Sequence, residues 1–88
     1  MTITFDPEKA VANVRKHGVR FSDAEQVLYD PMALTREDIA AVGEERFVSI
    51  GVDATGRILV VVYTYRDDEI RLISARLATP RERALYEK

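Results

Sequence analysis

Two neighbouring runs of β-branched and aromatic residues constrain the fold of this chain more than any other feature. Residues 58–65 and 70–78 both have the composition of strands, and Asp67-Asp68 between them is typical of a turn. A third such run, residues 46–52, comes before them across Asp53-Ala54-Thr55-Gly56, a hairpin-type connection. The three runs together predict an antiparallel β-meander.

Helix start and stop signals surround this meander. Asp6 as N-cap, Pro7 at the first helical position and Gly18 at the end predict a helix over about residues 7–17. Ser22 and Glu25 have the spacing of a capping box, which predicts a second helix that ends at Asp30-Pro31. The segment Thr79-Pro80-Arg81-Glu82 predicts a short C-terminal helix on the same grounds.

The other segments are short or polar. Residues 2–5 alternate like a short strand, residues 32–34 have the character of a short edge strand, and residues 36–45 suggest a mobile loop that includes Ala40 and Ala41. The sum is an α+β fold with two N-terminal helices, an antiparallel meander of three to five strands and a short C-terminal helix. We expect the helices to pack on one face of the sheet.

Composition limits what this fold can be. The 88 residues, 47% of them hydrophobic, suffice for one domain, which we expect to span residues 1–88. The absence of cysteine excludes disulfides and thiolate zinc sites, and with one histidine and no close carboxylate pair we expect neither a metal nor another cofactor. No apolar run reaches the length of a membrane span and the N-terminus does not resemble a signal peptide, so we expect a cytoplasmic protein without membrane contacts. The net charge of −2 counts against a nucleic-acid-binding surface, although a local basic patch remains compatible with it.

Strand alternation divides the side chains of the last two strands between two faces. With Asp67 and Asp68 at the turn, Tyr65 lies opposite Ile70 and earlier pairs follow in step. The face that we expect to form the core then holds Ile58, Val60, Val62, Ile73, Ala75 and Leu77. The other face, a half-exposed groove, holds Leu59, Val61, Tyr63, Tyr65, Ile70, Leu72, Ser74 and Arg76. Arg66 and Arg71 fall on the core side, and a bulge would move them, because a slip of one residue turns every side chain over.

Cationic and aromatic side chains around this hairpin are candidates for binding phosphate or RNA bases. Arginine offers a bidentate fork and lysine a point charge, and tyrosine rings stack on unpaired bases. For most of these residues a purely structural role is the simpler interpretation. Lys16, Arg66 and Arg71 would form surface ion pairs, and Tyr63 and Tyr65 would pack within the strands. For Arg76, beside Ser74, the two interpretations weigh equally. His17 is most simply a cation at a helix C-terminus, Glu82 a capping partner and Tyr86 a packing residue.

Nearly the whole chain resembles the BrnT family, small ribonuclease toxins of bacterial type II toxin–antitoxin systems. The resemblance rests on landmarks in the same order along the chain: Asp6-Pro7-Glu8-Lys9, Asn13, Arg15-Lys16-His17-Gly18-Val19, Phe21, Glu45-Arg46-Phe47, Ile70-Arg71-Leu72-Ile73-Ser74-Ala75-Arg76, Glu82 and Tyr86. Phe5 stands where the family usually has tryptophan, and Leu77 where a lysine is common. The resemblance implies a RelE-like fold and metal-independent RNA cleavage that arrests translation and growth. It also implies neutralisation by a BrnA-like ribbon-helix-helix antitoxin, which binds DNA, so that the toxin is linked to DNA only through the antitoxin.

The same resemblance implies a set of functional residues. The matching polar positions are Lys16, His17, Glu45, Arg46, Arg66, Ser74, Arg76, Glu82 and Tyr86. We expect His17 or Glu82 to act as the base, Arg66 and Arg76 to clamp the phosphate, and Lys16 or Tyr86 to serve as acid or positioning group. Further RNA contacts are expected from Arg46, Tyr63, Arg71 and Ser74. The alternative function, favoured by the acidic net charge and the missing lysine, is an inactive antitoxin-pairing or RNA-binding module of the same fold.

Overall fold

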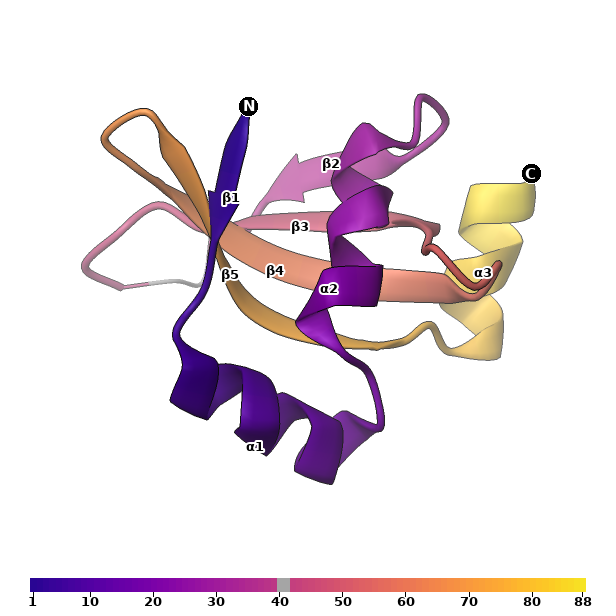
Figure 1. The fold of residues 1–88 in the computed structure, drawn as a ribbon. Helices are drawn as coiled ribbons and strands as arrows, with labels where there is room; N and C mark the ends of the chain where they lie inside the picture. The colour runs from indigo at the N-terminus through magenta and orange to yellow at the C-terminus, as the bar shows by residue number, and fades with distance from the viewer. Residues whose placement is uncertain (40–41) are drawn as a thin grey trace.

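A five-stranded mixed sheet forms the centre of the computed structural model, which describes residues 1–39 and 42–88 (Figure 1). The strand order is β1-β5-β4-β3-β2, with β1 at Thr2–Thr4, β2 at Leu34–Glu37, β3 at Phe47–Val52, β4 at Ile58–Arg66 and β5 at Glu69–Leu77. Strands β2 to β5 form the expected antiparallel meander, whereas β1 pairs with β5 in parallel. The α+β class and the antiparallel meander are therefore confirmed, and β1 adds a parallel strand to the sheet.

Two of the helices begin and end where the sequence predicts. Helix α1 spans Pro7–His17, with the Asp6 side chain accepting from the Glu8 N–H and Gly18 in the left-handed conformation at φ 71°. Helix α3 spans Pro80–Glu87 and starts with a complete capping box between Thr79 and Glu82. The longest helix in the described ranges has 11 residues, and none there is long and apolar enough to cross a membrane.

The second helix departs from its prediction. A short α-helix, α2, spans Phe21–Ala24 and continues as the 3₁₀ helix η1 over Glu25–Tyr29. Ser22 is not its N-cap, because the carbonyl of Arg20 already accepts from the N–H groups of both Asp23 and Ala24. Burial of Phe21, which is 1% exposed and packs edge-on against Phe5, sets this earlier start.

The edge strand also lies further along than the sequence predicts. Residues 30–33 form a turn in which Asp30 accepts from the N–H of Met32 through its side chain and from that of Ala33 through its carbonyl. Strand pairing therefore begins only at Leu34, and Arg36 and Glu37 belong to β2 instead of the predicted loop. The part of that loop formed by Ala40 and Ala41 lies outside the described residues.

The assignment of the two sheet faces is inverted for β4. The face packed against α2 and η1, here called the core face, contains Leu59, Val61, Tyr63, Ile70, Leu72 and Ala75, all at most 5% exposed. Residues 58–63 are apolar at every position, so alternation along β4 does not identify the inner face. The opposite face, here called the α3 face, carries Val48, Ile50, Val60 and Val62. Helix α3 lies against it, so the helices are not confined to one face of the sheet.

Candidate active site

A β-bulge in the β4–β5 pair gathers polar side chains on the α3 face. Val62 pairs with Ser74 and Tyr63 with Leu72, which leaves Ile73 as the extra residue. Beyond this point the alternation of β5 is reversed, so Arg71 joins Ser74 and Arg76 on the α3 face, and the end pair Arg66 and Glu69 lies there too. The ideal register, which puts Arg66 and Arg71 opposite Arg76, is therefore not adopted, and the bulge that the sequence left open brings the three onto one face. The predicted groove shared by Tyr63, Ser74 and Arg76 is wrong, since Tyr63 lies on the core face.

Arg76 and Glu82 form a bidentate ion pair on this face. Arginine Nη1 donates to Oε1 of Glu82 at 2.7 Å and Nη2 donates to Oε2 at 2.9 Å, while Nη1 also reaches the carbonyl of Leu77 at 3.3 Å. These bonds use the edge of the guanidinium formed by Nη1 and Nη2. The other edge, formed by the Nε–H and the second N–H of Nη2, has no partner among the described residues. The hydrogen bonds from Arg76 lower the pKa of Glu82 to about 2, and the pKa of Arg76 rises in turn.

A second polar contact fixes the other end of α3. The hydroxyl of Tyr86 donates to Oδ2 of Asp30 at 2.5 Å, and the same oxygen accepts from the N–H of Val52. Burial alone would raise the pKa of Asp30, but the bonds from Tyr86, Val52 and Met32 outweigh it and lower that pKa. The bond to Asp30 raises the pKa of Tyr86. Helix α3 has no buried residue, and the contacts of Glu82 and Tyr86 join it to Arg76 of β5 and to Asp30.

Lys16 and His17 come close to Ser74 at the C-terminal end of α1. These three residues and Ile73 line a shallow depression of about 180 Å³ between the helix and β5. Buried Asn13 fixes α1 there: its Nδ2 donates to the carbonyls of Val19 and Ala75, and its Oδ1 accepts from the N–H of Ala75. Asn13 thus pairs with the edge of β5 where β1 no longer does, which brings the helix end beside Ser74.

Four other sequence-predicted residues do not line this depression. Tyr63 is 5% exposed, stacks on Phe47 and shares a 2.9 Å hydrogen bond with Ser49, so its ring does not face solvent. Arg66, at the hairpin end, lies 3.7 Å from a carboxylate oxygen of Glu44. Arg46 precedes β3, with a buried Nε that has no hydrogen-bond partner in the described part of the chain. Arg71 lies on the α3 face, nearer to the hairpin turn than Ser74 and Arg76.

The sequence does not indicate the roles of two residues that shape this region. Asp30 is predicted only to end a helix, and Asn13 occurs only among the landmarks of the family resemblance. The Asp-Pro dipeptide signals a turn and therefore hints at the side-chain bonds of Asp30. No local signal points to Asn13, because it acts through a strand distant in sequence. Within residues 1–39 and 42–88, no group of three histidine or acidic side chains is arranged to hold a metal ion.

Two comparisons with known proteins agree with this architecture. The family model described as "Ribonuclease toxin, BrnT, of type II toxin-antitoxin system" matches residues 5–82. The crystal structure of the Brucella abortus ribonuclease toxin BrnT superposes with a TM-score of 0.68 and 27% sequence identity, over 90% of this chain and 97% of that one. No curated protein sequence matches the chain.

Proposed function

Because the chain belongs to the BrnT family of ribonuclease toxins of type II toxin–antitoxin systems, we propose that it is an endoribonuclease that cleaves RNA without a metal ion. Uninhibited cleavage would arrest translation and growth. Membership of a type II system implies an antitoxin partner. We further propose that this partner is a BrnA-like ribbon-helix-helix protein through which the toxin meets DNA only indirectly, and that the fold is RelE-like.

The observation that carries the proposal is the held guanidinium of Arg76. Glu82 binds its outer edge, which fixes its orientation and leaves the Nε–Nη2 edge for a second bidentate acceptor. A phosphate has the geometry that this edge prefers. Ser74, two residues before Arg76 on β5, lines one depression with Lys16 and His17 of α1, so the proposal gives a phosphate at Arg76 a hydroxyl, a cation and an imidazole from these three residues.

The reaction needs a base for the 2′-hydroxyl, charge stabilisation at phosphorus and an acid for the leaving 5′-oxygen. We assign the base to His17, because histidine is the commonest general base and because Glu82, with a pKa of about 2, is a poor proton acceptor at neutral pH. Lys16 is assigned as the acid or as a second phosphate contact. Tyr86 is less suited to donate a proton, since its bond to Asp30 raises its pKa.

In each turnover the 2′-oxygen forms a bond to phosphorus while the bond to the 5′-oxygen breaks. The 2′-hydroxyl proton passes to His17 and the 5′-oxygen receives a proton from the acid, so the products are a 2′,3′-cyclic phosphate and a free 5′-hydroxyl. Arg76 stabilises the additional negative charge on the phosphoryl oxygens. Glu82 acts as a positioning residue for Arg76.

The other predicted residues are assigned to the RNA strand beyond the scissile phosphate. Arg66 and Arg71 follow Arg76 along the α3 face toward the hairpin end, where they can contact successive phosphates. Arg46 remains a candidate for the same role. Because Tyr63 is buried on the core face, we assign it no contact with the RNA.

Induced expression in a bacterium without the antitoxin gene tests this function. We expect growth arrest and fragmentation of total RNA with the unmodified chain, and neither with Arg76→Ala at the same expression level. The matched control is Arg83→Ala, which removes the same charge from an exposed position of α3. Intact RNA with the unmodified chain would contradict the nuclease proposal, and full toxicity of Arg76→Ala would contradict the site.

A further inference from the structure

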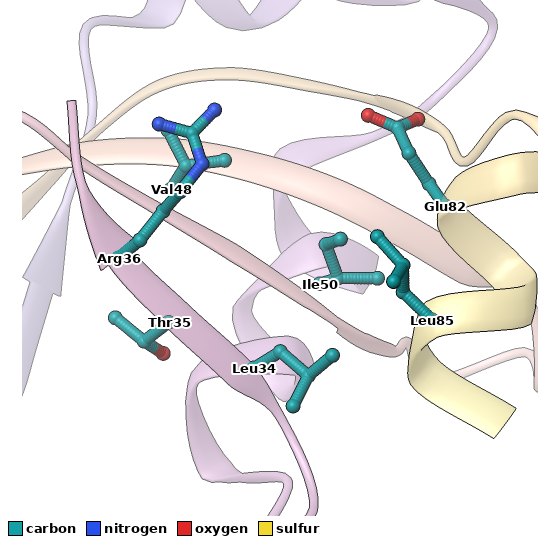
Figure 2. A pocket seen from close by; sticks show the side chains of 7 residues that line it. All are labelled: Leu34, Thr35, Arg36, Val48, Ile50, Glu82 and Leu85. Atoms are coloured by element: carbon teal, nitrogen blue, oxygen red, sulfur yellow. The ribbon is translucent and has the colours of Figure 1, made fainter. Parts of the chain in front are cut away.

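A groove on the α3 face shares only Glu82, the positioning residue for Arg76, with the proposed catalytic site. Its volume is about 320 Å³, and it is lined by β2, β3 and α3 through Leu34, Arg36, Val48, Ile50, Glu82 and Leu85 (Figure 2). Leu34 and Leu85 are 44% and 54% exposed although both are large apolar residues. Figure 2 shows the guanidinium of Arg36 beside Val48, away from Leu34, Ile50 and Leu85.

The strand register connects this groove to the candidate active site. Arg36 pairs with Val48, Val48 with Val62, and Val62 with Ser74, so one row across four strands runs from Arg36 to Ser74. The adjacent row runs from Leu34 through Ile50 and Val60 to Arg76. At the usual strand spacing each row is about 14 Å long. The α3 face is thus an apolar floor with an arginine at each side.

Arg36 is available for an anion. Its side chain is exposed, and within the described ranges its guanidinium donates to the carbonyl of Glu37 at a long 3.4 Å and has no carboxylate within ion-pair distance. Arg76, on the opposite side of the floor, retains its Nε–Nη2 edge. Two cations that flank an apolar floor are complementary to a nucleotide chain, in which phosphates flank each base.

We propose that the groove is a nucleobase subsite for single-stranded RNA. The strand crosses the sheet from Arg76 to Arg36, one unstacked base lies on Val48 and Ile50 against Leu85, and Arg36 binds the phosphate on its far side. The inference rests on the proposed ribonuclease function and makes Arg36 a substrate-binding residue. The volume favours one base over a protein helix, because 320 Å³ lies near the lower limit for small-molecule pockets.

Binding of RNA that resists cleavage tests the subsite. We would measure the fluorescence anisotropy of a short labelled strand with 2′-O-methyl riboses, and of an abasic strand of equal length, at several salt concentrations. Arg36→Ala should weaken binding of both strands to the same extent and reduce the slope of log affinity against log salt by about 0.7, the value for one phosphate contact on a single strand. Arg83→Ala serves as the control for the loss of one exposed charge.

The contact between the nucleobase and the groove is tested by changing a residue of the groove wall. Wild type should bind the abasic strand at least about fivefold more weakly than the base-bearing strand, as expected for loss of a stacked base. Leu85→Ser, an exposed position whose change leaves the core intact, should reduce this ratio. The proposal is overturned if Arg36→Ala behaves like Arg83→Ala, or if Leu85→Ser keeps the wild-type ratio.

Cleavage of unmodified RNA separates this proposal from the nuclease proposal. If the chain cleaves RNA but its groove variants bind RNA like the control variant, the nuclease proposal stands and the subsite is refuted. If the chain does not cleave RNA but binds it in a way that the groove variants weaken, the subsite stands and the nuclease proposal is refuted. If the groove variants bind RNA normally but lose the antitoxin, the groove is a protein-docking surface and the subsite is refuted.

Discussion

The substitution Glu82→Gln removes the negative charge of the Arg76–Glu82 ion pair on the α3 face and changes little else. Glutamine is accepted at the third position of a capping box, so the cap between Thr79 and residue 82 can persist while the ion pair with Arg76 is lost. Any change in stability then reports chiefly on the Arg76–Glu82 pair. The matched control is Glu8→Gln, which removes a carboxylate from the first turn of α1, where no described residue forms an ion pair with it.

The expected magnitude follows from the pKa of Glu82. A decrease from the ordinary value of 4.5 to about 2 corresponds to an upper limit of about 3 kcal/mol in the free energy of unfolding. The Arg76 side chain is 40% exposed and that of Glu82 is 24% exposed, so solvent screens the pair. We therefore expect Glu82→Gln to lower the free energy of unfolding by about 1–2 kcal/mol at pH 7, and Glu8→Gln by about 0.5 kcal/mol or less.

The dependence on pH distinguishes the ion pair from other causes. Because the pKa of Glu82 is lower in the folded state, its contribution is fully present above about pH 4.5 and is lost as the pH falls toward 2. Urea unfolding of wild type and variant at pH 7 and near pH 3 should show a difference that shrinks to under half its neutral value at the lower pH. Equal stability at pH 7, or the same difference at both pH values, would refute the reasoning.

The cleavage rate of the same variant separates two roles of Glu82. A positioning role predicts partial activity, since Arg76 keeps its charge but loses its fixed orientation. A role as general base predicts a loss of about 10²- to 10⁴-fold.

The remaining predictions concern the proposed catalytic residues and the attachment of α1. Arg76→Ala should lower the cleavage rate by about 10²- to 10³-fold, as removal of a charge-stabilising group does elsewhere, with an unchanged circular dichroism spectrum; a rate near that of wild type would exclude Arg76 from the chemistry. His17→Ala should lower the rate by about 10²- to 10⁴-fold, and unchanged cleavage would return His17 to a capping role. Asn13→Ala leaves the buried N–H of Ala75 and two carbonyls without their partner, so urea unfolding should show a loss of about 2–4 kcal/mol; a loss below about 0.5 kcal/mol would show that water replaces these bonds. Cleavage of RNA should persist in excess EDTA, and its loss there with recovery on adding Mg²⁺ would contradict the metal-independent mechanism.

Signals that act over a few residues were read correctly from the sequence. Asp6, Pro7 and Gly18 bound α1 because their capping interactions and backbone preferences are local. The same holds for Thr79 and Glu82 at α3, and for the Asp67-Asp68 turn, where Tyr65 pairs with Ile70 as predicted. The predicted start of the second helix was wrong because the local capping signal competed with burial. Phe21 packs into the core one residue before Ser22, the predicted cap.

The candidate site was predictable as a set of residues and not as an arrangement. Arg76 and Ser74 were recognised beside each other on one strand, and Lys16 and His17 at the end of a helix. Their proximity depends on Asn13, which attaches α1 to Ala75 across 62 positions of sequence. Arg36 was overlooked because the turn held by Asp30, itself fixed by Tyr86 and Val52, decides where β2 begins.

The sequence by itself determined the kinds of elements, most of their ends and the polar residues worth examining, because hydrogen bonds within a turn or cap depend on near neighbours. Only the tertiary structure decided which face of the sheet is the core. β4 is apolar on both sides, so its alternation is uninformative, and helices pack against both faces. A single extra residue, Ile73, then reverses the alternation of β5 and places Arg71 on the same face as Ser74 and Arg76. That bulge depends on pairing with β4, which local preferences do not specify.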